Sequence, residues 1–72
     1  MWQSKAASDL YRPVFINDDG WVLHHWNGIH PQWILTHRNG AAYWDNTGIP
    51  VTAVDVIQQW ADDIIKSIPP LP

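Results

Sequence analysis

The segment of residues 21–44 constrains the fold more than any other part of the chain. It holds four of the six tryptophans and all four histidines. Within it, Asn39-Gly40 is a residue pair preferred in two-residue β-hairpin turns, and strand-forming residues flank the pair on both sides. We therefore expect this segment to form the centre of an antiparallel sheet, with the rest of the chain arranged around it.

Chain length and cysteine content limit how the fold can be stabilised. The chain has 72 residues, near the lower limit at which one hydrophobic core offsets the entropy lost on folding. Cysteine is absent, so neither a disulfide nor a thiolate zinc site can contribute. The remaining sources of stability are self-association and large aromatic side chains, each of which buries about 150–250 Å².

The charge pattern argues against several classes of partner. Four Lys and Arg side chains face seven acids, all of them Asp, for a net charge of −3. The basic residues are scattered, so the basic patch needed for phosphate contacts is missing and no nucleic-acid partner is expected. No apolar run approaches the ~20 residues that span a bilayer, and the N-terminus lacks a signal-peptide layout. We expect a cytoplasmic protein without membrane contact.

Residue patterns predict four strands, each bounded by turn residues such as Gly, Asn and Pro. The predicted strands are residues 11–16, 21–26, 33–37 and 42–45. We expect 1–10 to form an N-terminal arm that could hold one helical turn, 11–68 to form a single domain, and 69–72 to form a proline-rich tail.

A C-terminal helix is predicted after the strands. Thr52 is the expected N-cap, with Asp55 at capping-box spacing and Val51 and Val56 at the positions of a hydrophobic staple. Pro69 and the proline after it end the helix. One apolar stripe recurs at intervals of three and four: Val54, Ile57, Trp60, Ala61, Ile64 and Ile68. The predicted fold is α+β, an antiparallel three- to four-stranded meander with this helix packed on one face (ββββα).

A two-residue turn at Asn39-Gly40 divides the hairpin into two faces. We predict that the helix covers the more apolar face, with Trp33 and Trp44 in the core. That face carries Trp33, Leu35, His37, Ala42 and Trp44, and the other carries Ile34, Thr36, Arg38, Ala41 and Tyr43. The second face also lacks the polar alternation of a solvated sheet. One helix covers only one side, so some aromatic rings must stay outside unless a second chain covers them.

Exposed aromatic rings indicate an interaction surface. We predict a small protein-binding module, a homodimer, that regulates or occludes a larger protein partner. The predicted partner-binding residues are Trp21, Trp26, Tyr43, Arg38 and His25. Two alternatives remain open: the same rings bind a carbohydrate-type ligand, or every ring serves the domain's own core. The register of residues 21–26, which decides between Trp21 and Trp26, also remains open.

The sequence predicts neither an enzyme nor a cofactor. It contains no nucleophile elbow and no Gly-rich phosphate loop. His24 and His25 are neighbours on a predicted strand and point to opposite faces, so a shared metal ion is not expected. The tail Pro-Pro-Leu-Pro resembles a polyproline II ligand, or it simply follows the end of the helix.

Overall fold

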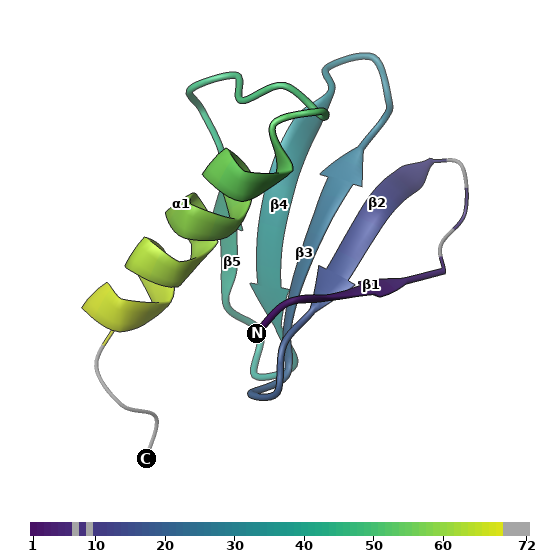
Figure 1. Ribbon diagram of the computed structural model, residues 1–72. Helices are drawn as coiled ribbons and strands as arrows, with labels where there is room; N and C mark the ends of the chain where they lie inside the picture. Colours follow the sequence, from purple (N-terminus) through teal and green to yellow (C-terminus); the bar gives the residue numbers. More distant parts are fainter. Residues whose placement is uncertain (7, 9, 69–72) are drawn as a thin grey trace.

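The computed structural model describes residues 1–6, 8 and 10–68, and it shows a five-stranded antiparallel sheet followed by one helix (Figure 1). The strands follow one another in chain order, each antiparallel to the next. Their bounds are β1 Gln3–Lys5, β2 Tyr11–Ile16, β3 Trp21–Trp26, β4 Gln32–His37 and β5 Ala42–Trp44, and the helix is α1 Val54–Ser67. The predicted ββββα class is confirmed, with one additional strand at the N-terminus.

The additional strand, β1, lies within the predicted N-terminal arm. Ser4 pairs with Phe15 of β2, in antiparallel register. Just before the strand, the Trp2 indole N–H donates to Asp62 Oδ1 of α1 at 3.0 Å. The arm is therefore an edge strand fastened to the helix, and no helical turn forms in its described residues. The predicted proline tail lies outside the described residues.

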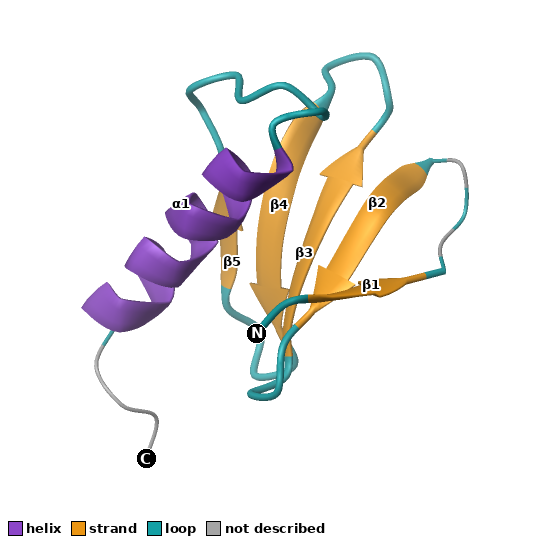
Figure 2. Ribbon diagram, in the orientation of Figure 1, coloured by secondary structure: helices purple, strands orange, loops and turns teal. Residues whose placement is uncertain are grey.

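The helix α1 crosses one face of the sheet (Figure 2). Burial of apolar side chains between the two layers supplies most of the stability of such a fold. The predicted apolar stripe is confirmed, because Val54, Trp60, Ile64 and Ile68 pack against the core. The buried core consists of Phe15, Trp21, Leu23, Trp33, Leu35, Ile57 and Ala61.

The start of α1 differs from the prediction. Ala53 occupies the N-cap position and makes no side-chain capping hydrogen bond. The backbone fixes the start instead, since the Ala53 N–H donates to the Pro50 carbonyl and the Ala53 carbonyl accepts from the Ile57 N–H. The prediction that Thr52 caps the helix is wrong, because a backbone turn places the helix one residue later.

The turn between β4 and β5 contains three residues and not the predicted two. The Gly40 N–H donates to the His37 carbonyl at 2.9 Å, and the His37 N–H donates to the Ala41 carbonyl at 3.0 Å. A two-residue type I′ turn needs positive φ at both central residues. In the described chain only glycines have positive φ, with Gly40 at 98°, so Asn39 does not meet that requirement. The result is a type I turn followed by one left-handed residue.

The longer turn shifts β5 by one residue relative to the prediction. Leu35 pairs with Tyr43, and Ile34 pairs with Trp44. A shift of one residue moves every side chain of a strand to the opposite face. Tyr43 therefore packs toward the core beside Trp21, with ring centroids 6.3 Å apart. The prediction of a core position for Trp44 is wrong, and this ring is 48% exposed on the other side of the sheet.

Candidate functional site

The sheet face opposite α1, termed the open face, is not covered by any helix or strand of the described residues (Figures 1 and 2). Cross-strand pairing places one row of side chains across all five strands of this face. In order from β1 to β5, the row is Lys5, Val14, His24, Ile34 and Trp44. Flanking positions on the same face are held by Tyr11, Ile16, Val22, Trp26, Gln32, Thr36 and Ala42.

Rings flank a buried apolar floor on the open face. Tyr11 is 41% exposed and Trp44 is 48% exposed, whereas Val14 and Ile34 between them are buried in the single chain. The His24 ring meets the Tyr11 ring edge to face, with centroids 5.5 Å apart. Large exposed rings beside a closed apolar floor are typical of an interaction surface.

Trp26 lies at the end of the open face, on the last residue of β3. A Cβ atom at Gly28 would overlap the Trp26 indole, so the missing side chain allows the ring to fold back over the connection between β3 and β4. The ring is half-buried in this position. Gly28 therefore sets how much of Trp26 the open face displays.

Negatively charged side chains are absent from the described strands that form the open face. The five strands, all within the described residues, contain no aspartate, and the described acids lie in turns, in the loop after β5 and in α1. Lys5 stands at one end of the row, on the edge strand. Like charges facing each other oppose association, so the lack of acids on this face suits an uncharged partner surface.

The imidazole of His24 belongs to the apolar row. Burial lowers the pKa of His24, because removal from water disfavours the charged ring. The neighbours of His24 in the row are the uncharged Val14 and Ile34, and the charged residue of the row, Lys5, lies two strands away. At neutral pH the ring is therefore uncharged and acts as a flat, mainly apolar group.

We expect stability to fall as the pH drops below about 6.5, the ordinary value for histidine. Because the pKa of His24 is lower in the folded chain, the unfolded chain takes up its proton first and is favoured on acidification. The stability that neutral His24 contributes is complete above the pKa of His24 in the unfolded chain, and it is lost as the pH falls toward the lower pKa of the folded chain. Urea midpoints at pH 7.5 and 5.5 measure it. The decrease should shrink in His24→Gln and persist in His30→Gln, a change at an exposed loop residue.

The structure brings one of the five predicted partner-binding residues to the open face, Trp26. Trp21 and His25 are buried on the helix-covered face, because β3 pairs them with His37 and Trp33. Tyr43 lies on that face as well, and Arg38 is exposed in the β4–β5 turn. Two residues of the open face, Tyr11 and Trp44, were not predicted. A three-residue turn that includes Gly40 would have predicted Trp44 on the open face. The position of Tyr11 is set by its pairing with β3, which no local sequence pattern reveals.

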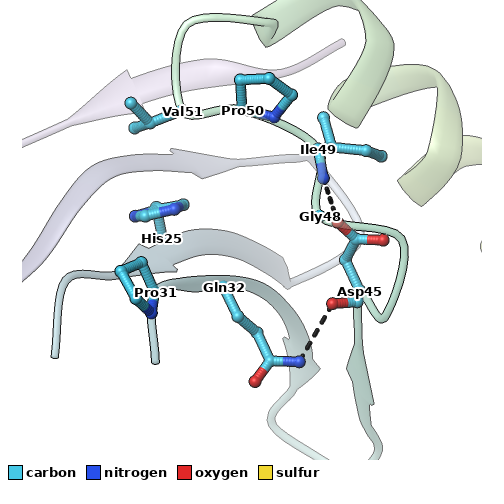
Figure 3. A pocket seen from close by; sticks show the side chains of 8 residues that line it. All are labelled: His25, Pro31, Gln32, Asp45, Gly48, Ile49, Pro50 and Val51. Carbon is cyan, nitrogen blue, oxygen red and sulfur yellow. Dashed lines mark hydrogen bonds between the residues drawn. The ribbon is translucent and has the colours of Figure 1, made fainter. Parts of the chain in front are cut away.

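A second concavity lies beside the loop that follows β5 and has a volume of about 250 Å³ (Figure 3). It is lined by His25, Pro31, Gln32, Asp45, Gly48, Ile49, Pro50 and Val51. The Gln32 amide donates to the Asp45 carbonyl at 3.0 Å and joins the loop to β4 (Figure 3).

Asp45 organises this loop and is only 3% exposed. Its Oδ1 accepts hydrogen bonds from the Thr47 N–H and hydroxyl, and its Oδ2 accepts one from the Ile49 N–H at 2.9 Å. Burial alone raises the pKa of the Asp45 carboxyl. The hydrogen bonds from Thr47, Ile49 and Gly48 outweigh this effect and hold the pKa below its ordinary value. The carboxylate therefore stays ionised while buried.

The described residues contain no group of three or more His, Cys, Asp or Glu side chains arranged to hold a metal ion. His24 and His25 point to opposite faces of β3, since they pair with Ile34 and Trp33 of β4, and of these two residues only Trp33 belongs to the core cluster packed against α1. Within the described part of the chain, no helix is both long and apolar enough to cross a bilayer.

Comparison with protein-family models, with curated proteins and with solved structures finds no match to this chain. Its class is therefore described by its own geometry. It is a small α+β module whose antiparallel sheet has one face covered by a helix and one apolar face open.

Proposed function

We propose that this chain is a protein-binding module that pairs with a second copy of itself through the open face. The observation that carries this proposal is the uncovered open face, on which Tyr11 and Trp44 remain 41% and 48% exposed in a single chain. Burying apolar surface contributes about 25 cal/mol per Å². A second sheet stacked on the first buries this surface at the usual separation of about 10 Å.

The size of the open face is compatible with a dimer of moderate affinity. Strands about 4.8 Å apart with a rise of about 3.3 Å per residue give the five strands a flat area of roughly 400–500 Å². Two faces together bury roughly 1,000 Å², near the lower limit for specific interfaces. We therefore expect a dissociation constant in the micromolar range rather than the nanomolar range.

The chemistry of the open face favours a protein surface over other partners. Phosphate-bearing partners need several cations, and the described row carries Lys5 alone. A sugar needs several polar groups around its stacking ring, whereas the positions paired on either side of Trp44 and His24 in the row are the apolar Ile34 and Val14. In this proposal the same face also contacts a larger protein, which the module regulates or occludes when the two copies separate.

Sedimentation equilibrium between about 1 and 200 µM tests the self-association. Trp44→Lys places a charge in the proposed interface, and we expect it to weaken the dimer at least 100-fold, about 2.7 kcal/mol. The matched control is Val56→Lys, because Val56 is 57% exposed on α1, away from the open face. This variant should keep the wild-type affinity.

Two results would contradict the proposed pairing: a wild-type chain that stays monomeric throughout this range, or equal weakening by both lysine variants. Tryptophan fluorescence distinguishes the carbohydrate alternative. A saturable emission change on adding oligosaccharides, lost in Trp44→Lys, would assign the face to sugars instead.

A further inference from the structure

His25 is a buried histidine with one nitrogen fixed by its neighbours. It is 6% exposed, and its ring packs edge to face on Trp33 with centroids 5.1 Å apart. The Asn27 side-chain N–H donates to the Arg12 carbonyl at 3.0 Å, which leaves the Asn27 oxygen to face His25. His25 Nδ1 lies 2.6 Å from that oxygen and therefore carries the hydrogen that it donates. In the neutral ring, Nε2 is then an acceptor.

The Nε2 atom of His25 opens into the concavity beside the loop. Within the described residues the His25 side chain makes one hydrogen bond, at Nδ1, and no fully enclosed side-chain nitrogen or oxygen lacks a partner. Nε2 is therefore not enclosed, and the cavity is the space that His25 lines. Figure 3 shows the ring between Pro31 and the segment of Pro50 and Val51. A buried, fixed hydrogen-bond acceptor thus faces a partly apolar space large enough for a small molecule.

The charge of the cavity wall is negative. Asp45 is ionised, and within the described residues every hydrogen bond to its carboxylate comes from a neutral N–H or O–H group. No described cation balances its charge. A carboxylate has about four lone-pair sites, and Oδ2 accepts one described hydrogen bond, from Ile49. Buried carboxylates gain most from a positive partner where water is excluded.

We propose that this cavity binds a primary ammonium group carried on a short alkyl chain. One ammonium N–H donates to His25 Nε2, and the negative charge of Asp45 balances the positive charge of the ligand. The alkyl chain packs on Pro31, Pro50 and Val51. A four-carbon chain fits the volume of about 250 Å³.

This site is independent of the proposed pairing. His25 points to the helix-covered side of β3, whereas the open face is on the other side, so each site can be lost without the other. A dimeric protein that ignores ammonium ligands would overturn only this inference. A monomer that binds them would overturn only the pairing.

Amide shifts in ¹H–¹⁵N NMR spectra test the site with n-butylammonium as the probe. We expect saturable shifts at Gly48, Ile49 and Val51, with a dissociation constant on the order of 1–10 mM for so small a ligand. Two comparison probes isolate the chemistry: 1-butanol has the chain without the charge, and tetramethylammonium has the charge without a donor. Each should bind at least tenfold more weakly.

Two variants locate the binding. His25→Phe keeps a planar ring but removes Nε2, and it should abolish the shifts. Because that change is in the core, Val51→Lys provides a second test at a residue that is 40% exposed at the cavity. Its own ammonium group should occupy the cavity and weaken n-butylammonium at least tenfold. Val56→Lys, with the same substitution on α1, should leave binding unchanged.

Three results would overturn the inference: no saturable shift in the wild-type chain, equal affinity for 1-butanol, or unchanged binding in Val51→Lys. A further comparison of two ligands identifies the source of the ammonium group. Tighter binding of Nα-acetyl-lysine methylamide than of n-butylammonium assigns the site to a lysine side chain of a peptide. The reverse order assigns it to a free amine.

Discussion

Replacing Trp33 by alanine is expected to lower the free energy of unfolding by about 3–5 kcal/mol. The ring is fully buried, stacks near Phe15 with centroids 6.3 Å apart, and donates its N–H to the Pro50 carbonyl at 3.4 Å. Its removal therefore leaves a cavity where the sheet, α1 and the loop before the helix meet. Folded domains have a total free energy of unfolding of about 5–15 kcal/mol, so a large part of the stability is lost.

Urea unfolding followed by circular dichroism measures this change. Ile29→Ala is the control, because Ile29 is the most exposed aliphatic side chain between β3 and β4 and its truncation should cost less than about 0.5 kcal/mol. A cost below about 1 kcal/mol for Trp33→Ala would mean that the core is not centred on this ring.

The second large effect is expected for Asp45→Ala, with a loss of about 2–4 kcal/mol. The change removes the acceptors for the Thr47 and Ile49 amides, and hydrogen bonds to a charged group contribute about 1.5–3 kcal/mol each. We expect less than the sum of the two hydrogen-bond contributions, because in the variant the loop can move and let water bind the two amides. Asp18→Ala is the control, with the same change of charge at an exposed turn residue.

The effect of Asp45 has a defined pH dependence. Its pKa is lowered in the folded chain, so its contribution is complete above the unfolded value of about 3.9 and is lost as the pH falls through the folded value. The difference between wild type and Asp45→Ala should therefore be constant near neutral pH and shrink below about pH 4. A difference that grows on acidification would contradict this origin.

Local patterns predicted the strands whose residues carry their own signals. The bounds of β2 and β3 agree with the prediction, because strand formers in both are bracketed by turn residues such as Gly20. The strand β1 was missed. Its residues Gln3–Lys5 are polar and exposed, and pairing with β2 together with the Trp2–Asp62 hydrogen bond holds it in place. These contacts join distant parts of the chain and leave no local pattern.

The candidate site was predicted as a class of surface rather than as a set of residues. The mismatch between two apolar sheet faces and one helix indicated an uncovered face, and the structure has one. Which rings it displays depends on cross-strand register. Trp21 and Trp26 both lie on β3 at positions of opposite parity, so residue type alone cannot assign them.

The three-residue turn before β5 also bears on how such a module can change its partner. A change that let residue 39 adopt a positive φ would allow a two-residue turn at positions 39 and 40, which would pair Arg38 with Ala41 and Leu35 with Trp44 and so shift β5 by one position. Tyr43 would then replace Trp44 on the open face, and the indole would face the core. A single substitution in the turn, such as Asn39→Gly, would thus exchange the ring offered to other proteins without altering any of the other strands, which makes this turn a point where binding specificity can diverge in one evolutionary step.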